Sequence, residues 1–256
     1  MFEQLLIAII QGITEFLPIS SSGHVTIASE LFGIEYSLFM LIWLHASSLL
    51  AVVVYYRKDI LILLPDFLLL MFNEENKQRP LAVKLAGATV ITGVIGLLLK
   101  PLLEDAVSFK IIGVMLIVTA GLIYLAEKFR THTKGSVFGW GHTALVGIAQ
   151  GLAVFPGLSR SGTTITYLVG AGIDRIDAVR ISFLLSIPTI GGTLALGLLD
   201  TENVALITTL PYILIFIVGF FTSLLSIKLM NLWVEKYWRL FIPYCVIVGT
   251  LVIIFL

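Results

Sequence analysis

The sequence predicts an all-α polytopic membrane protein with six transmembrane helices and two re-entrant helical hairpins in an inverted-topology repeat. Three observations predict this fold class. Hydrophobic residues make up 58% of the 256 residues and charged residues only 12%, whereas soluble domains are about 25% charged. Six stretches are long and apolar enough to cross a bilayer. Two polar segments, one in each half of the chain, repeat one another.

The predicted spans follow one another along the whole chain. They cover about residues 38–56, 81–99, 108–126, 177–199, 205–227 and 240–256. A further apolar segment, 60–72, is shorter than the roughly 20 residues that a span needs and contains Pro65. We expect an interfacial or partly inserted helix there. No low-complexity linker separates two soluble domains, so residues 1–256 are expected to form one integral membrane domain.

Basic residues near the ends of spans predict the orientation, because Lys and Arg there are retained in the cytoplasm. These residues cluster around the first, third and fifth loops between spans, whereas the second loop is balanced and the fourth carries only acidic charge. The basic residues are Arg57, Lys58, Lys77, Arg79, Lys84, Lys128, Arg130, Lys134, Lys228, Lys236 and Arg239. Loops one, three and five are therefore expected in the cytoplasm, and the C-terminus outside.

The two polar segments predict a duplication and the place of its binding site. Residues 11–24, QGITEFLPISSSGH, and residues 150–163, QGLAVFPGLSRSGT, align without a gap and are identical at six positions. The first segment would dip in from the outer face and the second from the inner face, with three spans after each. An odd number of crossings inverts the second copy. We expect repeats at about 1–126 and 140–256, with a site where the two segments meet.

The polar segments have the properties of an anion site. Pro18 and Pro156 break any helix, because proline lacks the amide hydrogen and clashes with the preceding turn. Such breaks at membrane depth have to be buried in protein or line a water-filled cavity. The Ser and Thr residues that follow are suited to cap the next helix, and helix N-termini attract phosphate. Ser20, Ser22 and Ser161 are candidate ligands, and close helix packing explains each of them equally well.

Charged and titratable residues in the same segments favour function over packing. A guanidinium at bilayer depth, as at Arg160, is costly and usually functional, and it can grip a phosphate through two hydrogen bonds. Glu15 beside a bound anion indicates a general acid/base or a divalent-cation ligand. His24 is a second candidate for proton transfer. His45, alone on an apolar span, is interpreted as a hydrogen-bonded core histidine.

In these motifs the chain resembles the undecaprenyl-diphosphate phosphatase family, the bacitracin-resistance type of membrane phosphatase. The family's first motif, two acidic residues four apart followed by a Pro-x-Ser-Ser-x-Gly-His run, appears here as Gln11, Glu15 and residues 18–24. The second motif, Pro-Gly-x-Ser-Arg-Ser-x-x-Thr, is matched in full by residues 156–164. The resemblance extends along essentially the whole chain. It departs at Gln11, which stands where the family's pattern has its first acidic residue.

The resemblance implies that undecaprenyl (polyprenyl) diphosphate is hydrolysed to the monophosphate and inorganic phosphate, which recycles a glycan carrier lipid for cell-wall synthesis in the plasma membrane. It implies a divalent cation, Mg²⁺ or Ca²⁺, with Glu15 as base or metal ligand. Ser21 would be the nucleophile or a phosphate ligand, His24 an acid/base, and Arg160 the clamp on the diphosphate. The implied substrate ligands are Gln11, Ser20, Ser22, Ser159, Ser161 and Thr164. Because Gln11 is not acidic, Glu15 alone would hold the metal ion.

Two other functions compete with this interpretation. A secondary transporter or lipid flippase shares the architecture of inverted repeats and broken helices, and serines beside an arginine could bind an anion without cleaving it. An acid-phosphatase-like membrane phosphatase needs a further histidine after the Ser-Arg pair, which residues 159–172 do not contain. The formal net charge of zero gives no indication of nucleic acid as a partner. A homodimer is left open.

Overall fold

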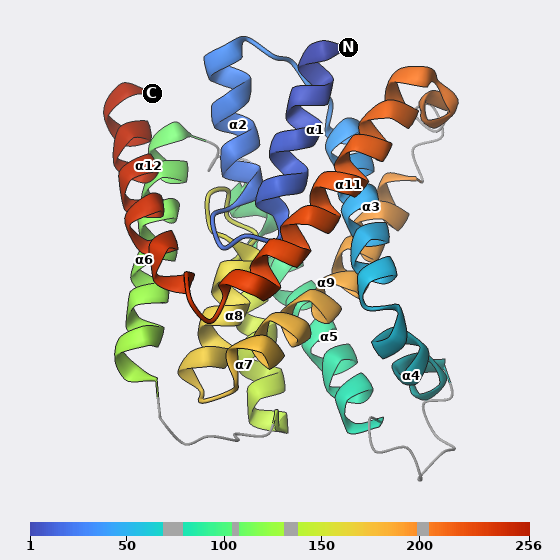
Figure 1. Ribbon diagram of the computed structural model, residues 1–256, viewed down its shortest axis with the longest axis vertical. Helices are drawn as coiled ribbons and strands as arrows, with labels where there is room; N and C mark the ends of the chain where they lie inside the picture. The colour runs from blue at the N-terminus through green and yellow to red at the C-terminus, as the bar shows by residue number, and fades with distance from the viewer. Residues whose placement is uncertain (69–78, 104–107, 131–137, 199–204) are drawn as a thin grey trace.

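The computed structural model describes residues 1–68, 79–103, 108–130, 138–198 and 205–256, which are helical apart from turns and short connections (Figure 1). The helices are α1 (Phe2–Glu15), α2 (Ser21–Phe32), α3 (Leu38–Tyr55), α4 (Arg57–Leu68), α5 (Arg79–Leu103), α6 (Phe109–Phe129), α7 (Trp140–Leu152), α8 (Arg160–Gly170), α9 (Arg175–Gly197), η1 (Ala205–Thr208), α11 (Leu210–Trp233), η2 (Trp238–Leu240) and α12 (Phe241–Phe255). Six helices in this part of the chain are long and apolar enough to span a membrane: α3, α5, α6, α9, α11 and α12 with η2. The predicted all-α membrane protein with six spans is confirmed.

The fifth span differs most from its predicted position. The sequence predicts residues 205–227, whereas α11 runs from Leu210 to Trp233. Pro211 lies in the first turn of the helix, where its missing amide hydrogen costs nothing. Residues 205–208 before it form η1 instead. At the other end the helix continues past Lys228, because a long basic side chain can extend its charge away from apolar surroundings.

Loops that enter the orientation argument lie partly outside the described residues. Among their charged residues, Lys77, Glu104, Asp105, Lys134, Asp200 and Glu202 are outside. The segment predicted as an interfacial helix begins at 60, and α4 covers it up to Leu68. Its remaining residues, 69–72, are also outside the described part. In Figure 1, α4 follows directly on α3 at one end of the bundle and runs in a different direction. The orientation across a bilayer stays a prediction.

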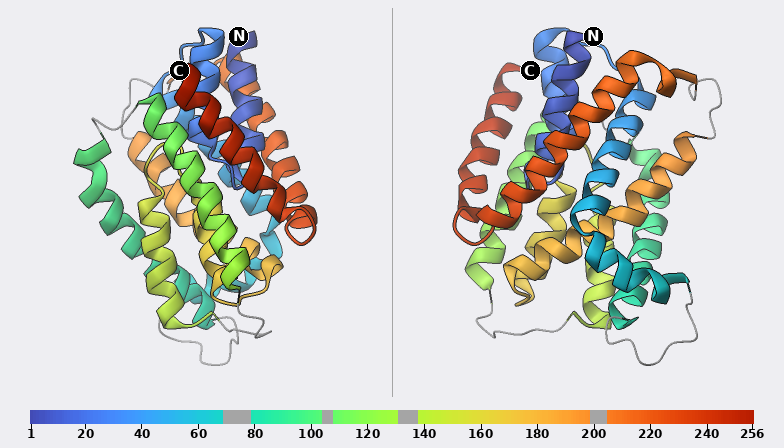
Figure 2. Two further views of the ribbon diagram at one scale, coloured as in Figure 1. Left: turned by 90° about the vertical axis from the view of Figure 1, so that its left-hand side faces the viewer. Right: turned by 45° about the vertical axis from the view of Figure 1, so that its right-hand side comes forward.

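Two helical hairpins enter the bundle from opposite ends. The hairpin of α1 and α2 enters from the end at which both chain termini lie, the hairpin of α7 and α8 enters from the other end, and their turns meet in the interior (Figures 1 and 2). The four helices have 14, 12, 13 and 11 residues, fewer than the roughly 20 needed to span. Opposite entry is what an inverted repeat requires. That the hairpins end inside a bilayer stays a prediction.

Protein packing covers the backbone where the hairpins turn. Gly157 has a φ of 89°, and a Cβ atom added there would lie 2.5 Å from the carbonyl oxygen of Ile112 on α6. Only glycine combines this φ with so close an approach. At the other turn, the Leu17 carbonyl accepts a hydrogen bond of 3.0 Å from the Ser161 hydroxyl on α8. One carbonyl of the broken backbone is therefore satisfied across the hairpin contact, as burial in an apolar environment requires.

Candidate active site

The two turns bring the N-termini of α2 and α8 to one cavity. Ser20 caps α2 by accepting a hydrogen bond of 3.3 Å from the Gly23 amide, and Ser159 caps α8 by accepting one of 3.0 Å from Gly162. The two serines occupy aligned positions of the repeat, so the predicted caps after each break are confirmed. Both line a cavity of about 370 Å³. Two helix N-termini give this cavity a positive potential that suits an anion.

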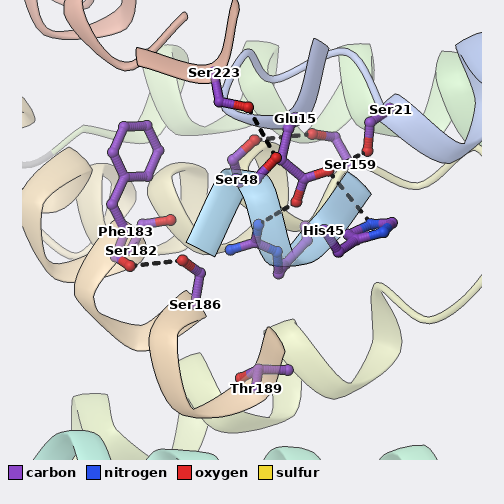
Figure 3. Close-up of polar contacts among 12 residues, drawn as sticks. Glu15, Ser21, His45, Ser48, Ser159, Ser182, Phe183, Ser186, Thr189 and Ser223 are labelled. Atoms are coloured by element: carbon purple, nitrogen blue, oxygen red, sulfur yellow. Dashed lines mark hydrogen bonds and ion pairs between the residues drawn. The ribbon is translucent and has the colours of Figure 1, made fainter. Parts of the chain in front are cut away.

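The Glu15 carboxylate connects the two hairpins. Glu15 is the last residue of α1 and only 6% exposed. Ser21 Oγ donates to its Oε2 at 2.6 Å (Figure 3), and Arg160 Nη2 donates to its Oε1 at 2.6 Å. Ser21 and Arg160 are the first residues of α2 and α8 and are aligned in the repeat. One carboxylate therefore joins equivalent positions of the two copies.

Arg160 retains a donor for a ligand. Its Nη1 is buried and has no hydrogen-bond partner within the described residues. A buried donor without a partner is costly, and the side chain lines the cavity. A phosphate oxygen in the cavity would give Nη1 the acceptor that it lacks once the side chain turned this covered atom toward the cavity. Arg160 can therefore bind a phosphate through one nitrogen while another nitrogen keeps the ion pair with Glu15.

Gln150 also lines the cavity and was not among the candidate residues. Its Nε2 donates to the hydroxyls of Thr189 and Thr92, at 2.9 and 3.3 Å. Both threonines donate their own protons to backbone carbonyls, so the amide nitrogen has to face them. Its buried Oε1 then has no partner in the described part of the chain. The repeat could have identified Gln150 from the sequence, because it is the identical, aligned counterpart of the candidate Gln11.

The structure corrects the interpretation of His45. Its Nδ1 does donate to a backbone carbonyl, that of Leu41, at 2.7 Å. The ring, however, is not in the core: the side chain is 31% exposed and lines the cavity. Its Nε2 lies 3.5 Å from Glu15 Oε2, and both residues are drawn in Figure 3. His45 is therefore part of the site that the sequence placed on the hairpins alone.

His24 faces away from the Glu15 cluster. Its Nδ1 donates to the Ser20 carbonyl at 2.8 Å, and its Nε2 lies 2.7 Å from the hydroxyl of Tyr244 on α12. The rings of His24 and Tyr244 are stacked, with centroids 5.7 Å apart. The residues that line the cavity do not include His24. Its role in proton transfer stays a prediction, and the structure brings it to neither Glu15 nor Ser21.

The implied phosphate ligands divide into two groups. Ser20, Ser22 and Ser159 line the cavity. Gln11, Ser161 and Thr164 do not, and their hydrogen bonds support its wall. Gln11 Nε2 donates to Glu15 Oε2 at 3.3 Å, Ser161 holds the hairpin turn described above, and Thr164 shares a hydrogen bond of 2.6 Å with the Ser182 hydroxyl. Contact with a substrate stays a prediction for all six.

Glu15 is the only carboxylate among the described residues that line the cavity. Within the described residues there is no group of three or more His, Cys, Asp or Glu side chains that could hold a metal ion. Both Glu15 oxygens already accept hydrogen bonds. Mg²⁺ in phosphate-transfer sites takes one or two carboxylates and fills its remaining positions with phosphate oxygens and water, so Glu15 would be its one carboxylate ligand here only in place of one of these hydrogen bonds.

Comparison with known proteins finds relatives over most of the chain. The family described as bacitracin resistance protein BacA matches residues 4–251. The chain is 43% identical over 235 residues to undecaprenyl-diphosphatase 2 of Halalkalibacterium halodurans, which covers 88% of this chain and 84% of that protein. It is 37% identical over 273 residues to the undecaprenyl-diphosphatase of Methanosphaera stadtmanae, with 98% and 96% covered. The undecaprenyl-diphosphatase of Desulfosudis oleivorans is 36% identical over 263 residues, with 96% and 95% covered.

Proposed function

The chain belongs to the bacitracin resistance protein BacA family, and we propose that the cavity between its hairpins is the active site of an undecaprenyl-diphosphatase. The enzyme hydrolyses undecaprenyl diphosphate to the monophosphate and inorganic phosphate. One observation carries the assignment of the site: a buried carboxylate, Glu15, is bound by Ser21 and Arg160 at the N-termini of two helices. The apolar exterior lets the lipid tail stay in the bilayer, and we place the protein in the plasma membrane.

Arg160 and the helix ends would bind the diphosphate. Phosphoryl transfer depends mainly on positioning and on neutralising the phosphate charge. Nη1 of Arg160 would donate a hydrogen bond to a phosphate oxygen, while Nη2 stays paired with Glu15. The N-termini of α2 and α8 would add their partial positive charges. Gln150 Oε1 cannot bind a phosphate oxygen, because both are acceptors, so a water molecule would fill that position.

Ser21 would attack the terminal phosphorus. Its hydroxyl proton is already directed at Glu15 Oε2, which takes the proton as the bond from Oγ to phosphorus forms. The bond from phosphorus to the bridging oxygen breaks, and polyprenyl monophosphate leaves with the electron pair. Glu15 releases that proton, takes another from the water that attacks the phosphoserine, and returns it to Ser21 as inorganic phosphate departs.

A divalent cation, Mg²⁺ or Ca²⁺, is the proposed cofactor, with Glu15 as its carboxylate ligand; when bound it neutralises phosphate charge. We expect Gln11→Glu to lower the Mg²⁺ concentration for half-maximal activity several-fold, because it adds a carboxylate beside Glu15. Without metal the variant should be less active, since neighbouring carboxylates repel. Phosphate release is measured against free Mg²⁺ concentration, with Gln4→Glu on the same helix as the control. An unchanged metal requirement would contradict the assignment of Glu15 as metal ligand.

A carrier for the same lipid is the second candidate, favoured by the two hairpins that enter from opposite ends. The two functions separate in one experiment. Purified protein in lipid nanodiscs is given undecaprenyl diphosphate and Mg²⁺, and inorganic phosphate is measured. If the protein is the enzyme, phosphate is released at a rate proportional to the protein concentration. In vesicles, movement of intact diphosphate between leaflets without phosphate release would contradict hydrolysis and support the carrier.

A further inference from the structure

We propose that His24 is a positioning residue, which holds the strained backbone of Ser20 and so directs the Ser21 hydroxyl at its base. Tyr244 on α12 fixes the ring of His24 for this purpose. The inference rests on the proposed function, because Ser21 is the nucleophile of that reaction. It replaces the acid/base role that the family resemblance implies for His24, and it adds a residue of the last span to the support of the site.

Ser20, the residue before Ser21, has an unusual backbone conformation. Its φ is 69° and its ψ is 101°, and no other residue except glycine has a positive φ in the described part of the chain. An N-cap residue is normally extended, as the aligned Ser159 is, with φ −72° and ψ 118°. A residue in so sparsely populated a region is strained and persists only where its surroundings hold it.

His24 supplies a contact that holds this turn. A carbonyl oxygen only accepts, so the contact of 2.8 Å between Nδ1 and the Ser20 carbonyl places a proton on Nδ1. In the neutral ring Nε2 then accepts, and the Tyr244 hydroxyl donates to it at 2.7 Å. The planes of the two rings are 10° apart. Both ring nitrogens are therefore engaged in bonds that orient the ring, one to the strained turn and one to α12.

The second copy of the repeat makes the same contact without a histidine. Thr163 is aligned with His24, and its hydroxyl donates to the Ser159 carbonyl at 2.7 Å. In each copy, a side chain thus donates to the carbonyl of the serine that caps its helix, four positions earlier. Threonine is not among the side chains that usually serve as general acids or bases. The role that the two aligned residues share is therefore the hydrogen bond to the cap.

The direction of Ser21 depends on the turn at Ser20. Ser21 begins α2, and its Oγ donates to Glu15 Oε2 at 2.6 Å. Rotation of the Ser20 backbone would move Ser21 relative to α1, which carries Glu15. Without the bond to His24, we expect Ser20 to relax toward the extended conformation of Ser159. The nucleophile would then lie outside the reactive geometry, and a misplacement of about 1 Å can cost about 100-fold in rate.

A matched pair of variants tests this role. His24→Thr introduces the residue of the second copy and keeps a donor for the Ser20 carbonyl, whereas His24→Val has the same shape without the hydroxyl. We expect kcat to be about 10-fold or more lower in His24→Val than in His24→Thr. KM should stay within about 2-fold of wild type in both, because the helix N-termini and Arg160 are unchanged. Phosphate release is measured against substrate concentration. Proton transfer by His24 would instead predict equal losses.

The strain at position 20 can be tested separately. Glycine tolerates a positive φ because it has no Cβ, so the bond from His24 should matter less in a Ser20→Gly background. We expect His24→Val to lower kcat less than about 3-fold there, and about 10-fold or more in a Ser20→Ala background, which keeps the Cβ. Each comparison is made within one background, so the loss of the Ser20 hydroxyl affects both members equally.

Tyr244→Phe keeps the stacked ring and removes the donor to Nε2. We expect kcat to fall about 3-fold, the effect of one hydrogen bond, with KM unchanged. Tyr124→Phe is the matched control, because Tyr124 on α6 is 52% exposed and does not line the cavity. Its kcat should equal that of the wild type. Thermal unfolding in detergent establishes that each variant is folded.

Equal losses of kcat in His24→Thr and His24→Val would overturn the positioning role, and so would wild-type kcat in His24→Val. The same effect of His24→Val in the Ser20→Gly and Ser20→Ala backgrounds would contradict the strained turn as its cause. Wild-type kcat in Tyr244→Phe would contradict the support from α12. In all these cases the wild-type protein still releases phosphate, and the proposed function stands. Absence of phosphate release from the wild-type protein would instead contradict the proposed function itself.

Discussion

Arg160→Ala is expected to lower kcat/KM for diphosphate hydrolysis by about 10³-fold or more, in line with the effect of an arginine that neutralises phosphate charge in phosphoryl transfer. The side chain supplies the one guanidinium that lines the cavity and the buried Nη1 that lacks a partner. Its loss also leaves the Glu15 carboxylate, 4% exposed as a side chain, without its counter-ion. Breaking such a pair costs about 3–5 kcal/mol of stability.

The loss of activity and the loss of stability can be separated. The double variant Arg160→Ala/Glu15→Gln removes the uncompensated charge, so it should unfold at a higher temperature than Arg160→Ala while remaining inactive. Arg160→Lys keeps the charge but not the planar fork, and it should recover stability more than activity. Arg57→Ala, at the start of α4, is a control for removing an arginine outside the cavity. Wild-type activity in Arg160→Ala would contradict the clamp.

Ser21→Ala is expected to lower kcat about 10³-fold with little change in KM, because it removes the attacking oxygen and leaves Arg160 and the helix N-termini in place. Steady-state phosphate release measures this effect. Ser29→Ala, which removes a hydroxyl from the same helix outside the cavity, should stay near wild type. Acid quenching of a single turnover with substrate labelled on the terminal phosphate should trap label on Ser21. Retained activity in Ser21→Ala, together with no label on the wild-type protein, would contradict Ser21 as the nucleophile and leave it as a phosphate ligand.

The six spans could be predicted because apolar length is a local property of the sequence, and the helix breaks because Pro18 and Pro156 act on their own segments. The positions of the candidate residues within the site are not local. α3 is apolar on most of its surface, so its sequence does not show which side faces the hairpins, and His45 appeared to be a core residue. Gln150 depends on Thr92 and Thr189, which come from α5 and α9 and are far away in sequence. Their proximity follows only from packing.

The same limit applies to His24. Its position in the first polar segment, close to Glu15 and Ser21, made it a candidate for proton transfer. Residues three apart on a helix lie on one face, but which neighbours that face meets depends on the surrounding helices. In the fold, His24 faces α12, and its Nε2 forms a hydrogen bond with the hydroxyl of Tyr244. The motif thus identified residues that are characteristic of the family. The packing of α12 determines which of these residues are in contact.

The contacts of Glu15 join aligned positions of the two polar segments. The aligned positions 21 and 160 hold serine in one copy and arginine in the other, and both bind the same carboxylate. The second copy has no carboxylate of its own, because Val154 stands at the position aligned with Glu15. Each copy therefore supplies a different half of the chemistry: the first gives the nucleophile and its base, and the second gives the cation that would hold the phosphates.

The central claim is that the two hairpins form one active site through Glu15 and Arg160. A double-mutant cycle on kcat/KM for undecaprenyl diphosphate tests it most directly, with Glu15→Gln, Arg160→Ala and the combination. We predict that each single variant loses about 10³-fold and that the double variant loses hardly more, because residues that act as a unit are not additive. Losses that multiply in the double variant, or wild-type turnover in either single variant, would contradict a shared site.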